Sequence, residues 1–203
     1  MAARERVRPR REDVRTDVLA AAREVFAESG YHRASLEAIA RRAGFSKGAV
    51  YSNFESKDDL FLALLEPEAD QMADLLSEIV EPSGDLDADL AALAGAIDAL
   101  TVSTPANLLF AEFRAHAARD HELAGRLAGI RSAMVAQMGE RLVIELHRVG
   151  AELIVPPRDA ATLLLAVING LALEHVGVDG QAVAADSLAH LLRGLVRPTP
   201  AGH

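Results

Sequence analysis

Apolar residues recur at intervals of three and four along most of the chain, and this spacing constrains the fold more than any other feature of the sequence. In the segment 11–29, for example, the apolar positions include Val18, Ala22, Val25 and Phe26. These intervals place side chains on one face of an α-helix, because the helix has about 3.6 residues per turn. Only the short piece from Leu153 to Val155 resembles a strand. The sequence therefore predicts an all-α protein.

Residues that favour helix ends divide this pattern into about nine helices. Gly30 stops the first helix. Ser35 and Gly44 bound a short second helix, since serine is a favoured N-cap and glycine adopts the left-handed conformation that ends helices. Ser46 and Ser56 have the same N-cap position for a third and a fourth helix, the latter continuing past a kink at proline 67. The remaining helices are expected at about 86–102, 106–119, 122–149, 158–176 and 181–196.

Composition excludes several classes of protein. The chain has no cysteine, so disulfides, thiolate catalysis and cysteine-ligated zinc are excluded, and its seven histidines lack the spacing of metal ligands. The N-terminal segment is rich in arginine but lacks the apolar run of a secretory signal. No segment approaches the roughly 18 apolar residues that a spanning helix needs. We expect a cytoplasmic protein with no cofactor, no metal and no membrane partner.

Charge is distributed unevenly, although the net charge of the whole chain is -9. Residues 1–60 hold 12 Lys and Arg against 10 Asp and Glu, whereas residues 61–203 hold 9 against 20. Five arginines lie among the first eleven residues. This asymmetry points to a nucleic-acid contact in the basic part, while a solvated flexible tail over residues 1–10 accounts for the arginines equally well.

The stretch GFSKG, residues 44–48, matches the G-x-S-x-G pattern in which serine is the nucleophile of a hydrolase. A nucleophile elbow requires a strand before the serine and a parallel sheet around it, and neither is expected here. Two short helices joined by a glycine turn are instead typical of a helix-turn-helix, whose second helix enters the major groove of DNA. An ordinary helical hairpin with a polar face is the alternative to that interpretation.

The only two lysines of the chain, Lys47 and Lys57, each follow a predicted N-cap serine directly. A cation at a helix N-terminus opposes the helix dipole and is unfavourable by about 0.3–1 kcal/mol when exposed. A bound phosphate would reverse this effect, because the backbone N–H groups and the ammonium then favour the same anion. The positions of the lysines therefore favour a phosphate contact over a purely structural role.

The run LEAIARRAGFSKGAVYSNFESKDDLFLAL, residues 36–64, resembles the DNA-binding domain of TetR-family transcriptional regulators. The pattern I-A-x-x-A-G-x-S-x-G-x-x-Y-x-x-F-x-x-K-x-x-L is matched at every position. The resemblance implies a basic flexible tail over 1–10, a helix-turn-helix domain over 11–56, and a helical effector-binding and dimerisation domain over 57–203. The DNA-binding residues that it implies are Ser35, Ser46, Lys47, Gly48, Ala49, Tyr51, Ser52, Asn53 and Lys57. Among them Lys47, Ala49, Ser52 and Asn53 are expected to face bases, and Tyr51 and Lys57 phosphates.

The same resemblance implies a homodimer whose last two long helices meet those of a second copy. The leucines and isoleucine expected at this interface are Leu164, Leu165, Ile168, Leu171, Leu188, Leu191, Leu192 and Leu195. Intramolecular core is the alternative for these positions, and both interpretations can hold. A largely apolar small-molecule effector is expected in the C-terminal domain. Its candidate lining comprises Met72, Phe110, Phe113, Arg114, Met134, Met138, His147 and Asn169, any of which could equally be plain core or surface.

The function that these features predict is a dimeric repressor that binds a palindromic operator and is released from it by an effector. Such a protein is not an enzyme and has no catalytic residue. The alternatives are a helical hydrolase that uses Ser46, and a TetR-like activator or ligand-independent regulator. A hydrolase would lose turnover on a Ser46→Ala substitution, whereas a DNA-binding protein would lose only a helix cap.

Overall fold

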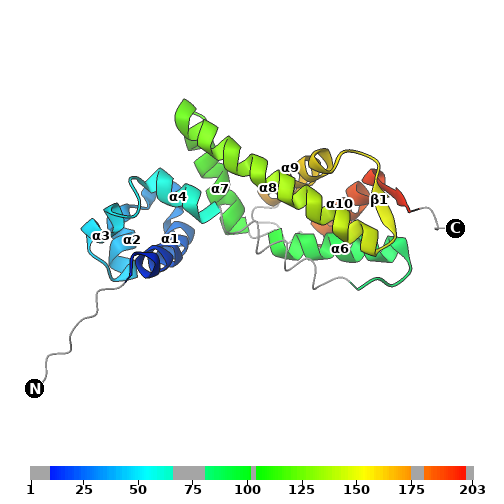
Figure 1. Ribbon diagram of the computed structural model, residues 1–203, viewed down its shortest axis with the longest axis horizontal. Coiled ribbons are helices and arrows are strands. Elements are labelled where there is room, and N and C mark those ends of the chain that lie inside the picture. Colours follow the sequence, from blue (N-terminus) through cyan, green and yellow to red (C-terminus); the bar gives the residue numbers. More distant parts are fainter. Residues whose placement is uncertain (1–9, 66–80, 102–103, 175–180, 200–203) are drawn as a thin grey trace, which may run out of the picture. The chain divides into compact units, whose positions relative to one another are not determined.

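The computed structural model describes residues 10–65, 81–101, 104–174 and 181–199, and within those ranges the chain forms nine α-helices and two short strands. The prediction of an all-α protein with about nine helices is confirmed. The chain divides into two compact units, Met1–Glu66 and Pro67–His203, which are labelled by their helices in Figure 1. None of the helices in the described ranges is both long and apolar enough to cross a membrane.

The N-terminal unit contains four helices. They are α1 (Arg11–Arg33), α2 (Leu36–Ala43), α3 (Lys47–Tyr51) and α4 (Lys57–Leu65). The predicted stop at Gly30 appears as an interruption of α1, because Gly30 has φ 73° and ψ 170° and one further turn follows it. A positive φ of this size favours glycine, which explains the residue at this position.

An aromatic cluster forms the centre of the N-terminal unit. The ring of Phe26 lies 5.2 Å from that of Phe61 and 5.9 Å from that of Tyr31, and the rings of Tyr31 and Phe61 are 5.4 Å apart. All three side chains are buried. Since Phe61 belongs to α4, this cluster ties α4 to α1. The structure therefore groups α4 with the N-terminal unit, whereas the sequence placed the domain boundary before Lys57.

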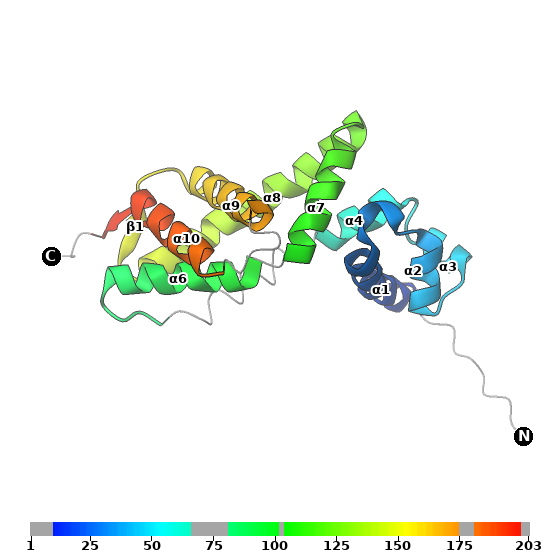
Figure 2. The same ribbon diagram turned by 180° about the vertical axis from the view of Figure 1, so that it is seen from behind.

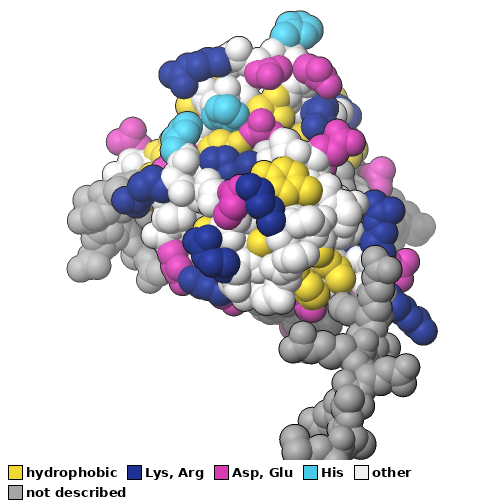
Figure 3. Space-filling view, turned by 90° about the vertical axis from the view of Figure 1, so that its left-hand side faces the viewer, with side chains coloured by type: hydrophobic (Ala, Val, Ile, Leu, Met, Phe, Trp, Pro, Cys, Tyr) yellow, Lys and Arg dark blue, Asp and Glu magenta, His cyan; other side chains and the backbone are white. Residues whose placement is uncertain are grey.

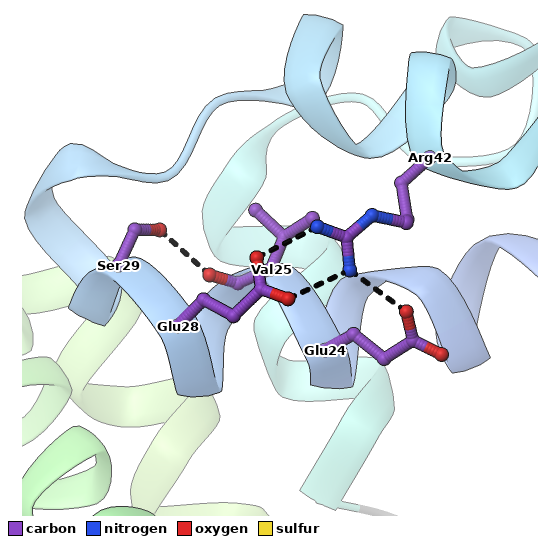
Figure 4. Close-up of polar contacts among 5 residues, drawn as sticks. All are labelled: Glu24, Val25, Glu28, Ser29 and Arg42. Atoms are coloured by element: carbon purple, nitrogen blue, oxygen red, sulfur yellow. Dashed lines mark hydrogen bonds and ion pairs between the residues drawn. The ribbon is translucent and has the colours of Figure 1, made fainter.

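An arginine clamp fixes α2 against α1 (Figure 4). The guanidinium of Arg42, on α2, donates to both carboxylate oxygens of Glu28 at 3.0 and 2.6 Å and to Glu24 at 2.8 Å. These hydrogen bonds hold the pKa of Glu28 below its usual value and raise that of Arg42. Exposed ion pairs contribute at most about 1 kcal/mol each, so the clamp orients α2 more than it stabilises the fold.

The C-terminal unit contains five described helices and both strands. They are α6 (Leu86–Thr101), α7 (Thr104–Ala117), α8 (His121–Arg148), β1 (Ala151–Leu153), α9 (Pro157–Glu174), α10 (Gln181–Leu195) and β2 (Val196–Pro198). Figures 1 and 2 show α10 running beside α6, and α9 beside α8. The helix ends that lie inside the described ranges are within two residues of the predicted ones: the start of α6, the end of α7, both ends of α8, the start of α9 and the end of α10.

One continuous apolar core joins α6, α8, α9, α10 and β1. It includes Leu93 and Ile97 of α6, Leu146 of α8, and leucines and alanines of α9 and α10. The helices α8 and α9 approach closely at Gly139, where an added Cβ would lie 2.8 Å from the carbonyl oxygen of Pro157. Glycine is therefore required at position 139 by packing.

The strands differ from the prediction. The strand-like piece was expected at Leu153 to Val155, whereas β1 begins at Ala151 and pairs antiparallel with β2, which the sequence did not predict. Glu152 pairs with Arg197 across the ladder, with Nε and Oε1 2.6 Å apart. A strand of three residues has no period that a sequence can reveal, and its pairing depends on contacts made after folding.

Candidate nucleic-acid interface

The turn between α2 and α3 is built by local hydrogen bonds. The hydroxyl of Ser35 accepts from the amide of Ala38 at 3.2 Å and caps α2. Gly44 adopts the left-handed conformation, with φ 73° and ψ 18°, and the amide of Phe45 then donates to the carbonyl of Ala40 at 3.0 Å. The predicted N-cap at Ser35 and helix end at Gly44 are both confirmed. The sequence thus forms a helix, a glycine turn and a second short helix.

The serine of GFSKG is the N-cap of α3. Its hydroxyl accepts from the amide of Ala49 at 3.2 Å, and the segment before it is the helix α2, not a strand. Val50 and Phe54 are fully buried and fix the inner side of α3. Ser46 therefore has the geometry of a helix cap, and the strained strand-to-helix turn of a hydrolase is not present at this position.

The outer side of α3 presents Lys47, Gly48 and Tyr51 to solvent, with Tyr51 44% exposed. A Cβ added to Gly48 would meet nothing within 4 Å, so no neighbour in the described structure requires glycine there. Glycine in a helix is unfavourable by about 1 kcal/mol relative to alanine. The groove-facing side of a helix-turn-helix is the place where a missing side chain allows close approach.

The sequence had indicated an unfavourable cation at the N-terminus of α3, but Lys47 has an acidic partner there. Its ammonium forms an ion pair with the carboxylate of Glu37 on α2, and it lies 5.5 Å from the centre of the Tyr51 ring. The hydrogen bond between the two side chains raises the pKa of Lys47 and lowers that of Glu37. The carboxylate offsets the unfavourable helix dipole in the free protein. Both side chains remain exposed to solvent.

Ser52 and Asn53, which were expected to face bases, complete the C-terminal end of α3. The hydroxyl of Ser52 and the amide of Asn53 donate to the carbonyl of Ala49 at 2.8 and 2.9 Å. Arg11 donates to the carbonyl of Ser52 at 3.0 Å, so the start of α1 lies beside this end. The helix α3 is only five residues long, and the polar side chains that follow it are held by its backbone. Arg11 is a residue that the sequence marked only as part of a basic segment.

The ammonium of Lys57, for which a phosphate contact is predicted, is held by backbone carbonyls of the chain itself. Its ammonium donates to the carbonyls of Tyr31, His32 and Ala34 at 2.7, 3.3 and 3.1 Å, and it lies 4.3 Å from the centre of the Tyr31 ring. An ammonium has three protons, and three carbonyls accept them here. Partial burial lowers the pKa of Lys57. This lysine therefore caps the C-terminal end of α1 and joins it to α4.

Figure 3 shows the end of the N-terminal unit that carries α2 and α3, with basic and acidic side chains interspersed on it. Residues 10–65 hold nine Lys and Arg and nine Asp and Glu, so the described part of this unit has no net charge. Electrostatic attraction to DNA must then come from where the charges lie and from the three arginines within residues 1–9.

The residues expected around an effector lie on three helices of the C-terminal unit. Phe113 is fully buried, while Phe110 carries the guanidinium of Arg114 5.9 Å from its ring centre. Met138 packs against the core, and the amide of Asn169 donates to the carbonyl of Leu165 at 2.6 Å.

Met134 and His147 do not share one compact site. They are thirteen residues apart on α8, which corresponds to about 20 Å along a helix. Met72 lies outside the described residues. Among the described residues, no group of three or more His, Asp and Glu is arranged to hold a metal ion.

The side chains expected at a dimer interface divide into two sets. Five of them pack in the core of the C-terminal unit: Leu164, Ile168, Leu188, Leu192 and Leu195. Three are half-buried: Leu165, Leu171 and Leu191. The exposed stripe of α9 consists instead of Leu163, Ala166, Gly170 and Leu173. The first set therefore belongs to the core of the chain itself and not to an exposed dimer surface. The sequence does not distinguish the two, because these helices have apolar residues on two sides.

Comparisons with known proteins agree with this geometry. The sequence model of the bacterial regulatory proteins of the tetR family matches residues 18–64, which run from α1 to α4. The transcriptional activator FasR of Mycolicibacterium smegmatis is 45% identical over 62 residues, covering 30% of this chain and 28% of FasR. The transcriptional repressor AcnR of Corynebacterium glutamicum is 41% identical over 64 residues, covering 32% of this chain and 34% of AcnR. The matched segments thus span about a third of these relatives.

A solved structure extends the likeness to most of the chain. A transcriptional regulator from Rhodococcus sp. Rha1 is 31% identical, with a TM-score of 0.61, and the match covers 88% of this chain and 91% of the Rhodococcus chain. These relatives are regulators of transcription and not enzymes. With the helix-turn-helix geometry and the matched residues 18–64, they show that the chain belongs to the TetR family of bacterial regulatory proteins.

Proposed function

We propose that this protein is a dimeric, sequence-specific DNA-binding regulator whose α3 enters the major groove. The single observation that carries the proposal is the exposed glycine at position 48, which has open space where its side chain would be and lies in the first turn of α3. Tyr51 and Lys47 flank it on the same exposed side. A small residue between two potential phosphate or base contacts suits close approach to a groove.

Within this proposal, the candidate DNA-binding residues have different roles, which their contacts in the described structure support. Lys47, Gly48, Ala49 and Tyr51 form the surface that would meet DNA, and Ser35 and Ser46 orient the backbone N–H groups of the two helix starts. Ser52 and Asn53 would act mainly by fixing the end of α3. Lys57 would act through the position of α4 and not through a phosphate.

The dimer surface that we propose is the exposed stripe of α9, Leu163, Ala166, Gly170 and Leu173. A Cβ added to Gly170 would meet nothing within 4 Å, so glycine there is not required by packing within the chain. Small residues let two helices approach, and a two-fold dimer would present two copies of α3 to a palindromic operator.

The effector-released repressor is the version of this function that we propose. The C-terminal unit is compact and has its own apolar core, which supports a ligand site formed by that unit alone. The effector must bind the DNA-free conformation more tightly than the DNA-bound one. Bound DNA must then lower the affinity for the effector by the same factor by which the effector lowers the affinity for DNA. The relatives include an activator as well as repressors, so the direction of regulation needs its own test.

Selection of bound duplexes from a random DNA library tests the proposal. We expect one enriched palindromic sequence, and affinity for it that falls steeply with salt. Tyr51→Ala should lower affinity for all duplexes, whereas substitutions at Ala49 should change which sequence is enriched. Failure to enrich any sequence with the full-length dimer would contradict the proposal.

Two further measurements separate its parts. Leu163→Asp should convert the dimer to a monomer in sedimentation, whereas Leu108→Asp, an exposed leucine of α7, should not. A reporter gene behind the enriched operator should be silenced by the protein, and induction instead of silencing would assign it as an activator.

A further inference from the structure

The ion pair between Lys47 and Glu37 places an acidic side chain at the proposed DNA-binding surface. Lys47 is the first residue of α3 and Glu37 is the second residue of α2, so the pair joins the two starting turns of the helix-turn-helix. Their side chains are 60% and 41% exposed. Bound DNA would meet both of them together.

The carboxylate of Glu37 has reasons of its own to stay in this position. An anion in the first turn of a helix is favoured by the helix dipole, and the Ser35 cap organises the same turn of α2. The pKa of Glu37 is lowered first by the hydrogen bond from Lys47 and next by a backbone N–H, so the carboxylate stays ionised near neutral pH. Glu37 would therefore remain negative when a phosphate approaches.

The ammonium of Lys47 can change partner. An exposed ion pair is weak, because water screens it and both side chains lose rotamer freedom. A DNA phosphate offers the same kind of contact, with release of a condensed counterion as an additional driving force. Binding of DNA through Lys47 thus requires exchange of a carboxylate for a phosphate at one ammonium.

We propose that Glu37 sets the strength of DNA binding by competing with DNA phosphate for the ammonium of Lys47. This inference rests on the proposed DNA-binding function and adds to it a residue that opposes binding. Its effect does not depend on sequence, since phosphates are alike in every duplex. Affinity for unrelated DNA is kept low by Glu37, and affinity for the operator is lowered by the same factor.

Three variants and one control test this competition: Glu37→Gln, Lys47→Ala and the double variant, with Glu24→Gln as the control. Glu24→Gln removes the same charge from the same unit, while Glu28 still holds Arg42 through two hydrogen bonds and keeps α2 in place. Fluorescence anisotropy of the full-length protein, with the enriched operator and a scrambled duplex at several salt concentrations, gives the affinity and the salt slope of each.

Glu37→Gln should bind both duplexes about two- to fivefold more tightly than the wild type for each bound copy, a range that corresponds to the energy of an exposed ion pair. Its plot of log affinity against log salt should be steeper by about 0.9 for each bound copy, because no released carboxylate then offsets the phosphate that Lys47 neutralises. In the Lys47→Ala background the same substitution should have no effect. Glu24→Gln should match the wild type.

A Glu37→Gln variant that binds like Glu24→Gln would overturn the inference, as would an effect that persists in the Lys47→Ala background. Either outcome leaves the DNA-binding function intact, provided that the wild type prefers the operator. If the wild type binds no duplex with preference, the proposed function itself fails, and the inference fails with it.

Discussion

Local polar contacts cap and orient the short helices of the N-terminal unit around its aromatic centre, whereas one continuous apolar core fixes the long helices of the C-terminal unit. The helices α2 and α3 have eight and five residues, and such short helices are not stable alone. Serine caps and a left-handed glycine supply their missing partners, and the ammonium of Lys57 supplies the donor at the end of α1. The helices α8 and α9, with 28 and 18 residues, bury one long face each. We therefore expect the stability of the N-terminal unit to depend on single polar groups, and that of the C-terminal unit to depend on the volume of its buried side chains.

Neighbouring leucines on α9 give the largest effect expected in the C-terminal unit. Leu164 is fully buried and Leu163 is 44% exposed. Leu164→Ala should lower the free energy of unfolding by about 2–5 kcal/mol, because it removes transfer energy and leaves a cavity. Leu163→Ala should change it by less than about 0.5 kcal/mol in a monomeric background, as exposed sites do. Urea unfolding measures both, and equal losses would contradict the orientation of α9.

The close approach of α8 and α9 predicts the next effect. Gly139→Ala places a methyl group 2.8 Å from the carbonyl oxygen of Pro157. Overpacking of this kind should lower the free energy of unfolding by about 1–3 kcal/mol. Gly125→Ala, on the same helix with nothing within 4 Å of the new Cβ, is the matched control and should be neutral or stabilising. Similar behaviour of the two variants would show that the helices are less tightly packed than described.

The two lysines of the N-terminal unit should differ in their effects on stability and on DNA affinity. Lys57→Met leaves three carbonyls at the end of α1 without their donor, which should destabilise the unit by about 1–3 kcal/mol. Lys47→Met removes an exposed ammonium and should change stability by less than about 1 kcal/mol. The order should reverse for DNA affinity, which Lys47→Met lowers directly. Thermal unfolding and anisotropy on the same samples compare the two, and equal stabilities would contradict the capping role of Lys57.

Local interactions of this molecule were predictable from the sequence. Ser35, Gly44 and Ser46 were predicted in their structural roles, because capping is a local interaction within three or four residues. Helix bounds in the C-terminal unit were also predicted closely, since glycine and proline punctuate them.

The partners of charged side chains and the inner side of apolar helices were not predictable in the same way. Lys57 reaches carbonyls more than twenty residues earlier in the chain, and Leu164 or Leu188 could be internal or external until the helices were packed. Such contacts depend on tertiary structure and not on local spacing.

Gly48→Ala tests the central claim, that the exposed side of α3 binds DNA, most directly. The new methyl group meets no neighbour in the protein, so helix propensity should raise the free energy of unfolding by about 0.5–1 kcal/mol. Affinity for the enriched operator should fall about tenfold, corresponding to about 1.4 kcal/mol, because the same methyl group meets the DNA. A stabilised protein with weakened DNA binding is the predicted result, and a stabilised protein with unchanged affinity would contradict the account.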